Sequence, residues 1–171
     1  MIKRIALVIV FLLLMLTVGC DTCRYQDNCY DNDVEFAVFS GIVYTDVLVP
    51  IDNEIKYALG SYTNDSMNNY DASTYFADNL IEMQNIQNEL NSVKIHDEDY
   101  LPILTSLKKM VKYRINMLTH GQEWLETLDE NKFGLARSYS DRAHEEDKVY
   151  LKLRLEFLET GMNELNGTSD T

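Results

Sequence analysis

Proline and glycine are scarce in this chain, with two prolines and seven glycines among 171 residues. Because both residues interrupt regular helices, their scarcity favours a helix-rich protein. At the same time, 46% of the residues are hydrophobic, which is too many for a chain that is disordered throughout. The composition therefore predicts a folded, mainly helical protein.

Basic residues are also few: 15 Lys and Arg stand against 28 Asp and Glu, for a formal net charge of −13. Binding of nucleic acid needs a basic surface, so we expect no nucleic-acid partner. A helix that lies on a membrane surface would also carry Lys and Arg on its polar face. We interpret the acidity as a source of solubility, with recognition of a cationic partner as the alternative.

Long apolar runs are missing, apart from one near the N-terminus. The run Ile5–Leu16 is twelve residues long and follows Lys3 and Arg4. A membrane-spanning helix needs about 20 apolar residues, so this run is short for one. A basic start, a short apolar middle and a small residue at the end are typical of an export signal.

The end of this segment, Thr17-Val18-Gly19-Cys20, resembles the signal of bacterial lipoproteins, in which the cysteine is lipidated and becomes the new N-terminus. Thr17 stands where that signal usually has leucine, and Leu16 lies one place further back. The resemblance implies that acyl chains on Cys20 anchor the protein to the lipid bilayer, at the extracytoplasmic face of the cell membrane. An uncleaved anchor and ordinary signal cleavage are the alternatives.

Cysteine is scarce as well, and its three copies are Cys20, Cys23 and Cys29. With Cys20 lipidated, Cys23 and Cys29 remain as a pair, and an exported protein favours their oxidation. We therefore predict a disulfide between them. A metal site and two free thiols are the alternatives, and the spacing offers no second ligand pair for a metal.

The chain divides into a signal peptide (1–19), a tether (20–33), a helical bundle domain (34–166) and a C-terminal tail (167–171). The part after the signal has the length of one domain. The predicted fold is all-α, an antiparallel bundle of three to four amphipathic helices behind the lipidated tether.

The pattern predicts helices over residues 34–62, 72–93, 100–128 and 132–165. Pro50 should kink the first helix, although the many β-branched residues there leave two strands as an alternative. Asp71 and Asp99 are the expected N-caps of the second and third helices, and Pro102 fits the first turn of the third.

The buried faces follow from three- and four-residue spacings. On the third helix we expect burial of Leu107, Val111, Ile115 and Leu118, against Leu153 and Phe157 of the last helix. The whole apolar stripe of the last helix is predicted to comprise Leu135, Tyr139, Ala143, Val149, Tyr150, Leu153, Phe157 and Leu158.

Motifs of catalysis are missing. The chain has no Gly-x-Ser-x-Gly elbow, no P-loop and no dinucleotide glycine pattern, and its cysteines lie in the tether rather than beside a histidine. We therefore predict that the protein is not an enzyme and uses no cofactor.

Two pairs of residues have a spacing that metal sites use. His120 and Glu123 are three apart on one helix, and Asp141 and His144 are three apart on the next. Carboxylate-x-x-His pairs on neighbouring helices build ferritin-like di-metal sites. The first pair is reversed and no bridging glutamates are evident, so we interpret the histidines as incidental and predict no metal.

Two features are candidates for binding. Lys108, Lys109, Lys112 and Arg114 form the one basic concentration, which is either a docking patch or a solvated helix face. Trp124, the single tryptophan, lies at the edge of an apolar stripe and is the aromatic side chain to test first.

Together these features predict a membrane-anchored lipoprotein that acts as a helical binding or interaction module, with an envelope protein as a possible partner. An exposed apolar patch would support this hypothesis. The alternatives are a metal-binding helical protein and a small solute-binding lipoprotein, and the latter requires a pocket.

Overall fold

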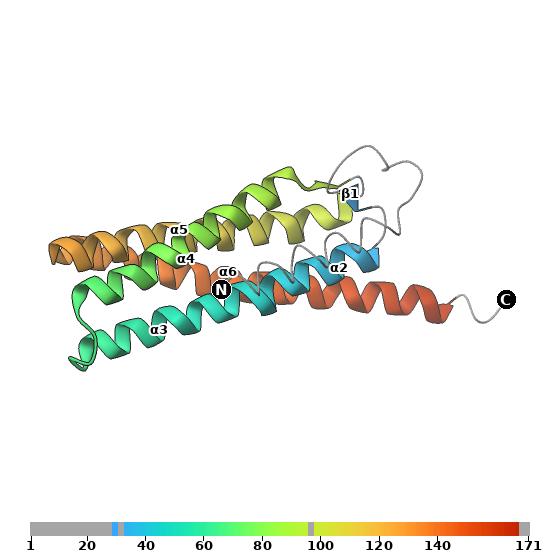
Figure 1. Ribbon diagram of the computed structural model, residues 1–171. Coiled ribbons are helices and arrows are strands. Elements are labelled where there is room, and N and C mark those ends of the chain that lie inside the picture. Colours follow the sequence, from blue (N-terminus) through green and yellow to red (C-terminus); the bar gives the residue numbers. More distant parts are fainter. Residues whose placement is uncertain (1–28, 31–32, 96–97, 168–171) are drawn as a thin grey trace.

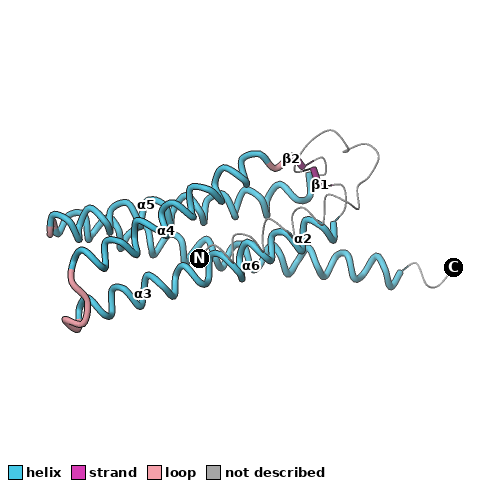
Figure 2. Tube along the Cα trace, in the orientation of Figure 1, coloured by secondary structure: helices cyan, strands magenta, loops and turns pink. Residues whose placement is uncertain are grey.

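The computed structural model describes residues 29–30, 33–95 and 98–167, and almost all of them are helical (Figures 1 and 2). Each of the four long helices runs antiparallel to the one before it, which confirms the all-α bundle (Figure 1). The signal peptide (1–19) and the lipidation candidate Cys20 lie outside the described residues. So do Cys23 and the last four residues of the chain.

The first long helix is continuous and consists of α2 (Asp33–Ile42), a π-helical stretch η1 (Val43–Leu48) and α3 (Val49–Thr63). No strand occurs here, so the two-strand alternative is wrong. A proline in the interior of a helix, such as Pro50, has no N–H group to donate, and its ring crowds the carbonyl group four residues earlier. The chain meets this constraint with a wider π-helical turn directly before Pro50.

The second helix, α4 (Asn69–Ser92), begins earlier than predicted, and Asn68 rather than Asp71 is its N-cap. The side-chain oxygen of Asn68 accepts a hydrogen bond from the Asp71 backbone N–H at 2.9 Å. The side-chain NH2 group of Asn68 donates to the Asp71 carboxylate, also at 2.9 Å. Asn68 has an extended backbone, which an N-cap requires, whereas Asp71 already lies in the first helical turn.

The connection after α4 contains β2 (Lys94–Ile95) and the 3₁₀ turn η2 (Glu98–Tyr100). Asp99 lies within this turn, so it is not the N-cap of α5 (Leu101–Thr127); Pro102 does lie in the first turn of α5, as expected. The short strand β1 (Cys29–Tyr30) pairs in parallel with β2, so two residues of the segment expected to be a tether pair with the connection after α4.

The last two helices form the tightest pair. Leu128 ends α5 in the left-handed conformation (φ 57°), and α6 (Glu130–Gly167) begins two residues later. The backbones of α5 and α6 lie close along much of their length, and α4 packs on α5. By contrast, α3 packs mainly on α4, and its backbone is not closely packed against α6.

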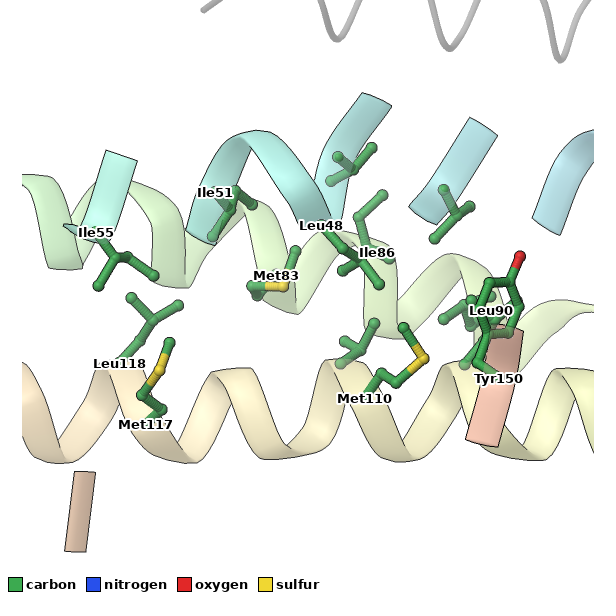
Figure 3. Close-up of a cluster of buried hydrophobic side chains, with 14 of the residues drawn as sticks. Leu48, Ile51, Ile55, Met83, Ile86, Leu90, Met110, Met117, Leu118 and Tyr150 are labelled. Atoms are coloured by element: carbon green, nitrogen blue, oxygen red, sulfur yellow. The ribbon is translucent and has the colours of Figure 1, made fainter. Parts of the chain in front are cut away.

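The core lies between the helices and is built by side chains from all four (Figure 3). Leu107, Val111 and Leu118 are buried as predicted, while Ile115, Leu153 and Phe157 are half-buried. On α6 the face toward the core carries Ala136, Ala143 and Tyr150, which repeat every seven residues. The prediction was wrong for three members of the α6 stripe, which are exposed because they point away from that face: Leu135, Val149 and Leu158.

Candidate functional site

A buried arginine joins three helices at the middle of the bundle. Arg114 of α5 is 1% exposed and forms paired hydrogen bonds with two carboxylates. Its Nε and Nη2 atoms donate to Asp52 at 3.0 and 2.6 Å, and its Nη1 and Nη2 atoms donate to Asp147 at 3.0 and 2.9 Å. The expectation that Arg114 belongs to an exposed basic face is therefore wrong.

The charges of this cluster stabilise the protonated guanidinium. Burial by itself lowers the pKa of Arg114, but the hydrogen bonds and the negative charges of Asp52 and Asp147 outweigh it and raise the pKa. Two tyrosines lie beside the cluster: the rings of Tyr44 and Tyr150 are 5.1 Å apart, and burial raises the pKa of both hydroxyls. The cluster is saturated with partners, so its role is to fix α3, α5 and α6 relative to one another.

Next to this cluster a pocket of about 200 Å³ opens between α3, α5 and α6. Most of its lining is apolar, with side chains from all four long helices: Ile55, Leu59, Phe76, Met117, Trp124 and Phe133. Four ionisable side chains also contribute to the lining: Asp52, Lys56, Arg137 and His144. We refer to this cavity as the Trp124 pocket.

The aromatic end of the Trp124 pocket is held by ring contacts. The Trp124 ring meets Tyr62 edge to face at 5.6 Å between centroids, and it packs against Phe133 at 4.8 Å. Both distances are in the range at which aromatic pairs stabilise one another. The indole of Trp124 is thus positioned by neighbours on α3 and α6, and it is half-buried.

Small residues make the room for the pocket. Gly121 of α5 is buried, and a Cβ atom on it would overlap the ring of Phe76 from α4. Ala136 and Ser140 of α6 line the opposite side with short side chains. Because α3 is not closely packed against α6, these small residues leave a space that larger ones would fill.

A larger hollow of about 710 Å³ lies over the connection between α3 and α4. It is mostly polar and open to solvent, and its lining includes the N-cap Asn68 and its hydrogen-bond partner Asp71. Ligand sites are typically concave and mainly apolar, so the smaller Trp124 pocket is the better candidate.

The residues proposed for a metal site do not converge. His120 Nδ1 lies 3.1 Å from Glu123 Oε2, but Lys132 Nζ contacts the same oxygen at 2.7 Å. The hydrogen bonds from Lys132 and then from His120 hold the pKa of Glu123 below its usual range. Asp141 is exposed and His144 lines the Trp124 pocket. Among the described residues, no three His, Cys, Asp or Glu side chains are grouped so as to bind a metal ion.

The other binding candidates lie apart from the pocket. Lys112 is exposed and Lys108 half-buried on α5, while the neighbouring Lys109 lies 3.9 Å from Glu146 of α6. Of the sequence candidates for binding, the structure places Trp124 at the pocket and Lys108 and Lys112 elsewhere. Sequence reasoning missed Phe76, Lys56 and Arg137 as pocket residues, because nothing in their local patterns distinguishes them from core or surface side chains.

None of the helices in the described part of the chain has the length and hydropathy of a membrane-spanning segment. Of the predicted Cys23–Cys29 disulfide, only the backbone of Cys29 is described, where it pairs with Lys94. Comparison of the chain with protein-family models, with curated proteins and with solved structures found no match.

Proposed function

We propose that the protein is a lipid-anchored binding module at the extracytoplasmic face of the cell membrane, which takes a small, mainly apolar molecule into the Trp124 pocket. The observation that carries the proposal is the pocket itself, an apolar cavity of about 200 Å³ with Trp124 in its wall. Acyl chains on Cys20 would anchor the protein in the bilayer, and the tether would connect this anchor to the acidic bundle. Such a function requires no catalytic residue.

The volume limits the ligand. Typical sites for drug-sized molecules measure about 300–1,000 Å³, whereas an apolar cavity of about 150 Å³ holds benzene. The Trp124 pocket therefore has the size for one ring or a short branched chain. A polymer or a multi-ring cofactor would have to extend into solvent.

Trp124 provides a direct readout, because it is the one tryptophan of the chain. The full chain, reconstituted in phosphatidylcholine vesicles, would be titrated with benzamide while the indole fluorescence is recorded. We expect a saturable change, which Ala136→Met abolishes by filling the pocket. Leu135→Met, on the exposed side of the same helix, should leave the change intact.

A linear response that is the same for the parent protein and both variants would contradict the proposal. So would a saturable change that survives in Ala136→Met, because the probe would then be binding elsewhere.

A second candidate function is docking of a protein partner, favoured by exposed leucines on α6. Leu151, Leu155 and Leu158 are 45%, 57% and 41% exposed, and their spacing of four and three residues is that of a coiled-coil seam. In the sequence the same spacing continues at Met162 and Leu165, before α6 ends.

The occupant we infer for this seam is a second copy of the chain. A seam with this spacing can pair with an identical seam, and Lys152 and Glu159 flank it with opposite charges. Amine crosslinking on intact cells should trap a dimer that Leu155→Glu removes and Leu135→Glu, off the seam, retains. The absence of a dimer, or a crosslink to a different envelope protein in its place, would contradict self-association.

A further inference from the structure

Basic side chains surround the Trp124 pocket, although an apolar cavity does not require them. Lys56 comes from α3, while Arg137 and His144 come from α6, so basic groups approach the cavity from two helices. Lys56 and Arg137 are exposed, and neither forms an ion pair with any residue that the structure describes. This is notable in a chain with 28 acidic and 15 basic residues.

Asp52, the one acidic residue of the lining, offsets these cations only in part. Both carboxylate oxygens of Asp52 accept hydrogen bonds from Arg114, at 3.0 and 2.6 Å. Arg114 also binds Asp147, so these three groups together carry one net negative charge, which is less than the two positive charges of Lys56 and Arg137. The pocket therefore presents an apolar interior together with a net positive charge.

We propose that the Trp124 pocket selects small anionic ring compounds, such as an aryl carboxylate, whose ring enters the cavity while the anionic group meets Lys56 and Arg137. The inference rests on the proposed function, since it specifies the ligand of the same pocket. The rings of Phe76, Trp124 and Phe133 supply apolar and aromatic contacts for a single ring.

The competing ligand class is a small cation, because aromatic side chains beside a carboxylate often bind ammonium groups. Two features oppose it here. The carboxylate of Asp52 is occupied by Arg114, and the free charges beside the pocket, Lys56 and Arg137, would repel a cation. Charge therefore distinguishes an anion from a cation of the same shape.

Three probes of nearly equal size separate these possibilities at neutral pH: benzoate, benzamide and benzylammonium. With the full chain in phosphatidylcholine vesicles and Trp124 fluorescence as readout, we expect benzoate to bind about tenfold more tightly than benzamide, as one charge-assisted hydrogen bond predicts. Benzylammonium should bind most weakly.

The variants Lys56→Gln and Arg137→Gln should each reduce the affinity for benzoate by a larger factor than the affinity for benzamide. Lys112→Gln, which removes an exposed lysine away from the pocket, is the matched control and should change neither. All three substitutions are at exposed positions, so the fold should be retained, which circular dichroism would verify.

The outcomes separate the two proposals. Equal affinities for benzoate and benzamide, or a preference for benzylammonium, would overturn the anion selectivity and leave the binding module standing. Failure of all three probes to bind saturably would overturn both. A loss of benzoate affinity in Lys112→Gln equal to that in Lys56→Gln would also overturn the selectivity, because it would reflect net charge alone.

Discussion

Arg114 of α5 and Asp52 of α3 form a two-point ion pair across the bundle, with N–O distances of 3.0 and 2.6 Å. The guanidinium is 1% exposed, and the side chain of Asp52 is 18% exposed. Asp52 also lines the Trp124 pocket. The pair thus joins the structural centre of the protein to its candidate binding site, and it sets a positive charge against the carboxylate that lines the pocket.

Removal of the guanidinium should strongly destabilise the fold. Arg114→Met leaves the carboxylates of Asp52 and Asp147 without their partner, and breaking a buried ion pair in this way costs about 3–5 kcal/mol. Because these carboxylates keep 18% and 14% exposure, we expect the lower end of that range. Urea unfolding followed by circular dichroism would measure the loss.

The control for Arg114→Met is the triple variant that also carries Asp52→Asn and Asp147→Asn. It removes the unpaired charges, so much of the stability should return. A triple variant as unstable as the single one would show that lost packing, and not unpaired charge, causes the effect.

The glycines of α5 and α6 should respond in opposite ways to alanine. Gly121→Ala forces a Cβ atom against the Phe76 ring, and overpacking of this kind typically costs about 1–3 kcal/mol. Gly134→Ala adds a Cβ atom with nothing within 4 Å, so it should stabilise its helix by up to about 1 kcal/mol.

Thermal melts of both glycine variants would test this prediction. Phe76→Leu combined with Gly121→Ala should lose less stability than the sum of the two single changes, because the smaller side chain relieves the overlap. Equal shifts for Gly121→Ala and Gly134→Ala would mean that Gly121 and Phe76 are not in contact.

Glu89 of α4 should make the stability depend on pH. Its Oε2 atom is buried without a hydrogen-bond partner among the described residues, and burial raises the pKa of its carboxyl group. A folded-state pKa above the unfolded one contributes stability at low pH, and that contribution is lost as the pH rises through the folded-state pKa.

At neutral pH Glu89→Gln should therefore be more stable than the parent protein, and the difference should vanish below the unfolded pKa of about 4.3. Urea unfolding at neutral and acidic pH would measure the difference, with the exposed Glu159→Gln as the control that stays close to the parent. A parent protein that is more stable than Glu89→Gln at neutral pH would show that the carboxylate has a favourable partner.

Truncation of a leucine in the apolar stripe of α5 should lower the stability of the fold far more than truncation of an exposed lysine on the same helix. Leu118 is fully buried, and truncation of such a residue typically costs about 2–5 kcal/mol, so Leu118→Ala should lower the melting temperature markedly. The side chain of Lys109 is 53% exposed and has one long contact of 3.9 Å with Glu146, so Lys109→Ala should change little. Similar melting temperatures would contradict the helical register.

Mass spectrometry can test whether Cys20 is the lipidated N-terminus. We expect the membrane-extracted protein to begin at Cys20 and to carry acyl chains there, and Cys20→Ala should release the domain or leave an unprocessed precursor. Mass spectrometry of the N-terminal peptide would decide. An intact Met1 terminus, or an unmodified Cys20 in the surrounding medium, would contradict lipidation.

The sequence by itself determined the features that depend on neighbouring residues. The apolar spacing on α5 predicted the burial of Leu107, Val111 and Leu118, and scarce proline and glycine predicted long helices. Local patterns also located the helix ends to within a few residues. Asp71 was mistaken for a cap because aspartate and asparagine both suit that role, and the choice of Asn68 depends on where the chain turns.

Only the tertiary structure decided the site. Arg114 lies 62 residues from Asp52 and 33 from Asp147, and a pairing over such distances leaves no local signal. Because Lys109 and Lys112 lie close to it in the chain, the sequence predicted that Arg114 shares their basic face. The structure exposes both lysines and buries Arg114. The Trp124 pocket likewise exists because α3 and α6 stay apart while Gly121, Ala136 and Ser140 are small. Which residues share a cavity depends on how whole helices pack, and that is set by the sum of many contacts rather than by any one segment.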